Sequence, residues 1–191
     1  DLEREELQDK ISEIVVGSIS AYMDINKNKI KFYDHHTCHV MYGYYANSNK
    51  KNKTIAITVD AYGDGRNQTV WKIENNEFEL IASSNECEIA RLYRMVTLYL
   101  RMKPLEHEFK VMGLAPYAKD KYSERVVEVF KDLLTFDGLR VVHKDRPNDL
   151  FNFLNEKLKY FRFDNIAGGI QKYTENILNE LFVKASKELG I

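Results

Sequence analysis

The chain has 191 residues, of which 44% are hydrophobic and 30% charged, a composition typical of globular proteins and not of disordered or fibrous ones. Its 28 Lys and Arg residues balance 29 Asp and Glu residues, so no net field draws it onto nucleic acid or an acidic membrane. Two cysteines exclude a disulfide framework, and no apolar run approaches the roughly 20 residues of a membrane span. We therefore expect a cytoplasmic protein without membrane or nucleic-acid partners.

The first predicted elements are a helix, a turn, a strand and a second helix. Apolar residues recur at helical spacing over 7–22, which predicts an amphipathic helix packed against a sheet. A polar turn at 26–29 precedes a short predicted strand at 30–33. A helix over 36–47 should follow directly.

The middle of the chain predicts a sheet. Residues 54–59 are mostly β-branched and apolar, which indicates a buried central strand ending at Asp60. Two alternating runs at 68–74 and 77–82 flank Asn75-Asn76, a pair suited to a hairpin turn. Helical patterns then fill much of the remaining chain, which predicts a single α/β domain with helices over 88–102, 123–134, 150–160 and 165–189.

The segment Asp34-His35-His36-Thr37-Cys38-His39 contains three of the five histidines. On a helix, His35 and His39 project from one face, so two neutral imidazoles could bind one metal ion. Asp60, where a strand ends, is the natural carboxylate partner, and this set suits a catalytic Fe, Mn or Zn ion with open positions. The spacing is equally compatible with His35 capping a helix and His39 packing in the core.

A second segment, Glu106 to Tyr117, mixes close charges with a small apolar turn. Lys110 beside a turn at Gly113 could meet a phosphate or carboxylate oxygen, with Glu108 fixing its direction. The residues alone favour the other interpretation, a surface Glu-Lys pair of little energetic weight.

Four segments in order resemble the NodU/CmcH-type carbamoyltransferases, and a stretch near Gln171 and Glu175 resembles the family's long helix. The four are H-H-T-C-H at 35–39, D-A-Y-G-D-G at 60–65, L-Y-R-M-V-T at 92–97 and E-F-K-V-M-G-L-A-P-Y at 108–117. The resemblance implies that residues 1–191 are a single-domain fragment of the amino-terminal carbamoyltransferase domain. It also implies an actin/Hsp70/sugar-kinase-like, ribonuclease H-like fold, with a mixed sheet flanked by helices, related to the enzymes that make threonylcarbamoyladenosine in tRNA.

The implied reaction transfers a carbamoyl group from carbamoyl phosphate, through a carbamoyl-adenylate made with ATP, to a hydroxyl of a sugar or natural-product acceptor. By resemblance, His35, His39 and Asp60 match the metal ligands, and the metal is expected to be iron, with zinc as the alternative. It would polarise the carbamoyl-adenylate as a Lewis acid.

Further roles follow from the same resemblance. Lys110 lies in the family's K-V-M-G-L-A element, and we assign catalytic roles to His36 and Lys110, with His36 orienting a ligand or acting as acid or base. Cofactor contacts are assigned to Gly63, Asp64, Lys110 and Gly113.

Some features depart from the family pattern. Ala61 stands where the family commonly has glycine, which weakens the expectation of a close backbone approach to phosphate. The family's early strands and its carboxy-terminal domain, with the nucleotide loop and a further aspartate, are expected to be missing. The chain alone is therefore expected to be inactive, and a bare sheet edge would favour a homodimer.

Two other functions remain open from the residues. One is an actin-like or sugar-kinase-like ATPase, although those folds use carboxylates and Mg²⁺ in place of a His-x-x-x-His pair. The other is a non-catalytic interaction module in which Cys38 joins His35 and His39 around a structural zinc ion, so that metal removal unfolds the protein.

Overall fold

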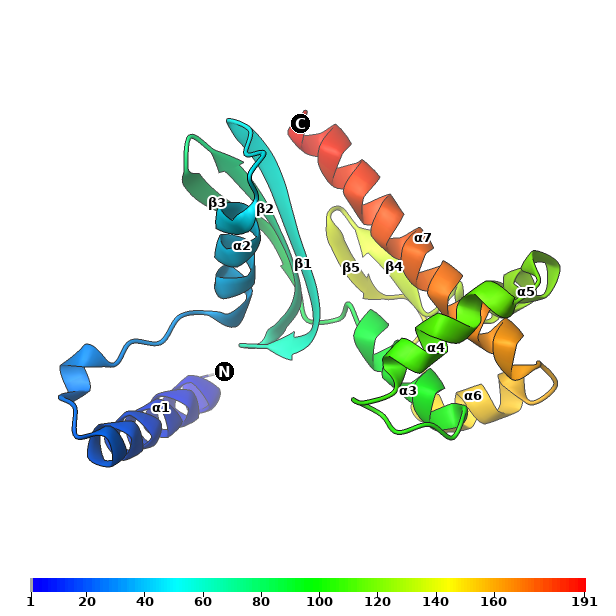
Figure 1. Ribbon diagram of the computed structural model, residues 1–191, viewed down its shortest axis with the longest axis horizontal. Coiled ribbons are helices and arrows are strands. Elements are labelled where there is room, and N and C mark those ends of the chain that lie inside the picture. The colour runs from blue at the N-terminus through cyan, green and yellow to red at the C-terminus, as the bar shows by residue number, and fades with distance from the viewer. Residues whose placement is uncertain (1) are drawn as a thin grey trace. The chain divides into compact units, whose positions relative to one another are not determined.

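The computed structural model describes residues 2–191, which form two compact units divided after Asp34 (Figure 1). The first unit contains the helix α1 (Leu2–Met23) and the short 3-10 helix η1 (Lys27–Lys29). The strand predicted at 30–33 is wrong, because these residues form no strand and belong to neither of the sheets among the described residues. Leu7 and Ile14 of α1 are exposed, and the packing of this helix against a sheet stays a prediction.

The second unit is built on a three-stranded sheet of β1 (Lys53–Gly63), β2 (Arg66–Glu74) and β3 (Glu77–Ser84). The strand order is β1-β2-β3, so β2 is central and the prediction that 54–59 forms a central strand is wrong. The hairpin at Asn75-Asn76 is confirmed, and both residues have positive φ, 52° and 65°.

A second sheet consists of the hairpin β4 (Leu134–Asp137) and β5 (Arg140–His143), which the sequence did not predict. All described strand pairs are antiparallel, and the expected mixed sheet is not found in residues 2–191. The reason is local, since each pair of consecutive strands within a sheet is joined by a turn of two residues, which can only reverse the chain.

The helices of the second unit follow the predicted order, with α4 as an addition. The predicted helices at 36–47, 88–102, 150–160 and 165–189 are found within a few residues, and the one at 123–134 is shifted toward the N-terminus. Their bounds are α2 (His35–Ala46), α3 (Ile89–Tyr99), α4 (Glu108–Leu114), the 3-10 helix η2 (Ala115–Tyr117), α5 (Asp120–Phe130), α6 (Leu150–Leu158) and α7 (Phe163–Leu189). No helix within residues 2–191 is long and apolar enough to cross a membrane.

The three-stranded sheet is covered on both faces. Alternate residues of β1 point to opposite sides, so Ile55, Ile57 and Val59 pack into the main core with the helices α3 and α7. Ala56 and Trp71 pack on the other face, against the helix α2. Figure 1 shows this arrangement, with α2 on one side of the sheet and α7 on the other. The polar segment at 35–39 is therefore carried against the sheet.

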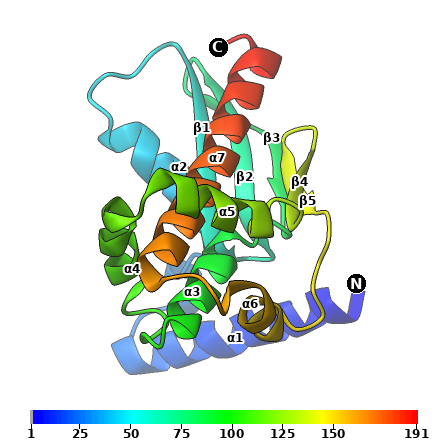
Figure 2. The same cartoon turned by 90° about the vertical axis from the view of Figure 1, so that its right-hand side faces the viewer.

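The helix α7 packs against α5 and η2 (Figure 2), and two of its glycines, Gly168 and Gly169, lie at these contacts. A Cβ atom built on Gly169 would lie 2.4 Å from Cβ of Val126 in α5, and one on Gly168 would lie 2.4 Å from Cβ of Ala118. No side chain fits in either place without displacing a packed neighbour.

We expect Gly169→Ala to destabilise the protein by about 1–3 kcal/mol, since the new methyl group overpacks the α5–α7 contact. Gly43→Ala is the matched control. Gly43 lies inside α2 with open space at its Cβ position, so the same substitution should stabilise by about 0.5–1 kcal/mol. Urea unfolding measures both values, and similar changes in the two variants would contradict the close packing at Gly169.

Candidate metal centre

His35 and His39 of α2 meet Asp60 of β1 at one point. The Asp60 Oδ2 atom accepts a hydrogen bond from His35 Nε2 at 2.6 Å and lies 3.3 Å from His39 Nε2. The two imidazole Nε2 atoms are 3.1 Å apart. The three side chains are 40%, 52% and 38% exposed, so their ligand atoms converge at a place that solvent and small molecules can reach.

Asp60 is held in its charged form. The hydrogen bond with His35 is the main cause that keeps the pKa of the Asp60 carboxyl below its usual value, and it outweighs the partial burial that acts in the opposite direction. The Ala61 N–H adds a second hydrogen bond, to Asp60 Oδ1 at 2.6 Å. A carboxylate must be ionised to bind a metal, so this environment favours a ligand role for Asp60.

The donor set fits a catalytic transition metal. Two imidazole nitrogens and one carboxylate oxygen suit zinc or iron, and three protein ligands leave positions open for substrate or water. These three residues are the one potential metal-binding group found in the part of the chain that the structure describes, and Cys38 does not belong to it. His39 is exposed, so the alternative in which it packs in the core is wrong.

Gly63 and Asp64 lie beside His35, at the turn between β1 and β2. The Asp64 Oδ2 atom accepts a hydrogen bond from the backbone N–H of His35 at 2.7 Å and thereby caps the first turn of α2. A Cβ atom on Gly63 would lie 2.2 Å from Cδ2 of the His35 ring. Both predicted cofactor-binding residues therefore contact a predicted metal ligand, and their role toward a cofactor stays a prediction.

His36 points the other way, into the interface between α2 and the sheet. It is fully buried, with Nδ1 2.7 Å from the Thr58 hydroxyl and Nε2 donating to the Arg66 carbonyl oxygen at 3.1 Å. Both ring nitrogens are occupied by the protein. His36 is thus directed away from the exposed centre, and its role as acid, base or orienting residue stays a prediction.

Lys110 and Gly113 both lie on α4 and are exposed. The tight turn predicted at Gly113 is wrong, because the helix begins at Glu108 and continues through this residue to Leu114. Glu108 accepts a hydrogen bond from the Leu105 N–H instead of directing Lys110. Lys110 lies near the face of the Phe109 ring, 5.8 Å from its centroid, and its predicted catalytic role stays a prediction.

Comparison with known proteins identifies the family of this chain. Residues 2–190 match the family model described as carbamoyltransferase N-terminus, which is nearly the whole chain. The chain belongs to this family.

Relatives are identical to this carbamoyltransferase N-terminal domain at about a quarter of the aligned positions. The uncharacterised protein MJ1051 of Methanocaldococcus jannaschii is 27% identical over 87% of this chain and 32% of its own length. The uncharacterised protein MJ1058 of the same organism is 25% identical over 86% of this chain and 30% of its own. The nodulation protein NolNO of Sinorhizobium fredii is 25% identical over 88% of this chain and 25% of its own length. The chain thus spans about a third or less of the length of these relatives.

Three segments that resemble family motifs meet around α7 in this carbamoyltransferase domain. They are 92–97, 108–117 and the stretch near Gln171 and Glu175. The Tyr93 hydroxyl of α3 donates to Gln171 Oε1 at 3.0 Å, and Gln171 Nε2 donates to Glu175 at 2.7 Å. Burial, followed by the carboxylates of Glu175 and of Glu108 in α4, raises the pKa of Tyr93 to about 12. Tyr93 therefore stays a neutral hydrogen-bond donor at physiological pH.

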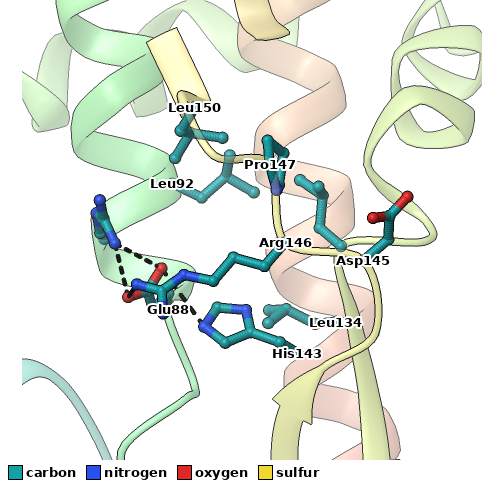
Figure 3. A pocket seen from close by; sticks show the side chains of 10 residues that line it. Glu88, Leu92, Leu134, His143, Asp145, Arg146, Pro147 and Leu150 are labelled. Atoms are coloured by element: carbon teal, nitrogen blue, oxygen red, sulfur yellow. Dashed lines mark hydrogen bonds and ion pairs between the residues drawn. The ribbon is translucent and has the colours of Figure 1, made fainter.

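A separate small pocket lies between α3 and the segment that joins β5 to α6 (Figure 3). Glu88 accepts two hydrogen bonds from Arg91 and one from Arg146 there, and His143 Nε2 lies 3.7 Å from its carboxylate. The space amounts to about 30 Å³, enough for very few water molecules. The sequence does not indicate this ion cluster, since its members are up to 58 residues apart.

The raised pKa of Tyr93 predicts a loss of stability at high pH. A tyrosine with a raised folded-state pKa contributes stability that is present below pH 10 and is lost as the pH rises toward 12. Tyr93→Phe should reduce this alkaline loss by about 2 kcal/mol, since a tenfold difference in proton affinity between the folded and unfolded states corresponds to about 1.4 kcal/mol. Urea unfolding at pH 8, 10 and 11.5 tests it; an identical pH dependence in the variant would contradict the assignment.

Proposed function

We propose that this domain supplies a metal-binding part of the active site of an O-carbamoyltransferase. The observation that carries the proposal is the convergence of His35, His39 and Asp60 within a carbamoyltransferase-family chain. The whole protein would use carbamoyl phosphate and ATP to form a carbamoyl-adenylate. Its acceptor would be a hydroxyl of a sugar or natural product, a choice supported by similarity to a protein named for nodulation.

The residues of this chain have distinct tasks in the proposal. The Nε2 atoms of His35 and His39 and one carboxylate oxygen of Asp60 bind the ion, expected to be iron with zinc as the alternative. When bound, the ion acts as a Lewis acid toward a carbonyl or phosphate oxygen of the carbamoyl donor. Asp64 and Gly63 hold His35 in place, and the exposed side of the centre admits donor and acceptor.

The other two functions have less support. The pair of histidines differs from the carboxylate and Mg²⁺ sites of actin-like ATPases and sugar kinases. A structural zinc site would call for a closed shell of four ligands, whereas Cys38 stands outside the described group and all three members are solvent-accessible.

The proposal is tested on the whole protein that contains this domain, purified without added metal, by metal analysis and by carbamoyl-phosphate-dependent ATP turnover. We expect about one metal ion per chain in the parent protein, and loss of most metal and turnover in His39→Ala and Asp60→Ala with an unchanged circular dichroism spectrum. Cys38→Ser is the control, because this exposed residue lies on the same helix outside the ligand group. Full metal content in both His39→Ala and Asp60→Ala would refute the proposed site.

Gly63→Ala provides a test through geometry alone. Its new Cβ atom would lie 2.2 Å from Cδ2 and 2.8 Å from Cβ of His35, so the His35 side chain must move from its place beside Asp60. We expect metal affinity to fall by roughly 10-fold or more, the range typical of changes in groups that orient a ligand. Titration of the metal-free protein with Zn²⁺ by calorimetry measures the affinity, with Gly43→Ala as the control. Unchanged affinity in Gly63→Ala would contradict the requirement that His35 be held in this place for metal binding.

A further inference from the structure

A continuous chain of buried hydrogen bonds lies directly behind the candidate metal centre. The Trp71 indole N–H donates to Thr69 Oγ1 at 2.8 Å, and the hydroxyls of Thr69 and Thr58 are 2.5 Å apart. Thr58 Oγ1 is 2.7 Å from His36 Nδ1, and His36 Nε2 ends the chain at the Arg66 carbonyl oxygen. All four side chains are buried, so their hydrogen-bond partners are protein groups.

The chain of hydrogen bonds has one direction in which every donor and acceptor has a partner. A carbonyl oxygen can only accept, so the His36 proton lies on Nε2 and its Nδ1 accepts from the Thr58 hydroxyl. Thr58 then accepts from the Thr69 hydroxyl, and Thr69 accepts from the Trp71 indole. No donor is left over in this arrangement, and the direction fixes the tautomer and orientation of His36.

The same two elements carry the proposed metal ligands. His36 lies between His35 and His39 on α2, and Thr58 lies two residues before Asp60, on the same face of β1. The bond from His36 to Thr58 therefore joins the helix to the strand at the point where their ligand atoms must meet. A change in this bond would therefore act on the position of the histidines relative to the carboxylate.

We propose that the buried chain from Trp71 to His36 positions the metal ligands, so that His36, Thr58 and Thr69 are positioning residues of the centre. This inference rests on the proposed metal site. Buried polar networks add little net stability compared with apolar packing, but they specify one geometry. A chain placed immediately behind three converging ligand atoms thus serves geometry more than stability.

Thr58→Val tests the inference, because it keeps the side-chain shape and removes the hydroxyl in the middle of the chain. We expect about 10-fold weaker Co²⁺ binding to the metal-free protein and an altered Co²⁺ absorption spectrum, which reports ligand geometry. Thr58→Ser restores the hydroxyl and should bind within about twofold of the parent protein. Thr69→Val breaks the chain one bond further away, so its loss of affinity should be smaller.

Tyr44→Phe is the matched control. It removes the hydrogen bond from Tyr44 to Asn76 Oδ1, 3.0 Å long, which also joins α2 to the sheet but at the far end of the helix. We expect lower stability to urea with unchanged Co²⁺ affinity and spectrum. This separates loss of positioning from general loosening of the interface.

The outcomes distinguish this inference from the proposed function. Parent-like Co²⁺ affinity and spectrum in Thr58→Val would overturn the positioning role while leaving the metal site in place. Equal loss of affinity in Thr58→Val and Tyr44→Phe would also overturn it, in favour of a purely structural role. Absence of Co²⁺ binding in the parent protein, with no difference from His39→Ala, would overturn the metal site itself. Where Thr58→Val does not fold, the comparison of Thr69→Val with Tyr44→Phe decides in the same way.

Discussion

The candidate centre depends on the contact between the first turn of α2 and the β1–β2 hairpin. Two interactions of different kinds fix it: Asp64 caps the helix at the His35 N–H, and His36 bonds to Thr58 and the Arg66 carbonyl. Each bond joins residues 22 to 30 positions apart, so the contact exists only in the folded chain. Without it, a helix of twelve residues would be marginal by itself, and its histidines would have no fixed relation to Asp60.

Helical geometry explains how neighbouring histidines serve different purposes. Residues 36, 40 and 44 recur every four positions and form the buried stripe of α2, which packs on Trp71 and Ile73. His35 and His39 form a second stripe rotated by about 100°, which places them at the edge of the interface beside the end of β1. One helix thus presents a core-facing imidazole and two solvent-accessible ones within five residues.

The pleat of β1 likewise places neighbouring residues of the strand in different surroundings. Ile55, Ile57 and Val59 face the main core, whereas Ala56, Thr58 and Asp60 face α2. The regular pairing of β1 with β2 is interrupted after Val59, and the next residue of the α2-facing row, Asp60, is an accessible carboxylate. This also explains why its sequence suggested a central strand: both faces are covered although the strand lies at the edge of its sheet.

The sequence predicted the long helices, the β2–β3 hairpin and the meeting of two histidines with Asp60, since these follow from periodicity, turn residues and family motifs. It did not predict the hairpin of β4 and β5, whose strands of four residues are too short to show alternation. It predicted a turn at Gly113, but this residue lies inside the helix α4. The helix tolerates a glycine there because the position is exposed and has no neighbour near its Cβ position. The spacing separated His36 from the two predicted ligands, but the sequence could not show that His36 is buried, because its partners Thr58 and Arg66 lie 22 and 30 residues away.

The spacing of the three ligand atoms bears on how a metal ion could be accommodated. Two atoms that each lie about 2.0–2.1 Å from one tetrahedral ion are roughly 3.3 Å apart. The separations from His39 Nε2, 3.1 Å to His35 and 3.3 Å to Asp60, are already close to this value. Only the His35–Asp60 hydrogen bond, at 2.6 Å, must lengthen as coordination replaces the shared proton. Because most of this geometry is set by the fold, little ordering would remain to oppose binding at the proposed site, and its metal affinity would depend mainly on the position of α2 on β1.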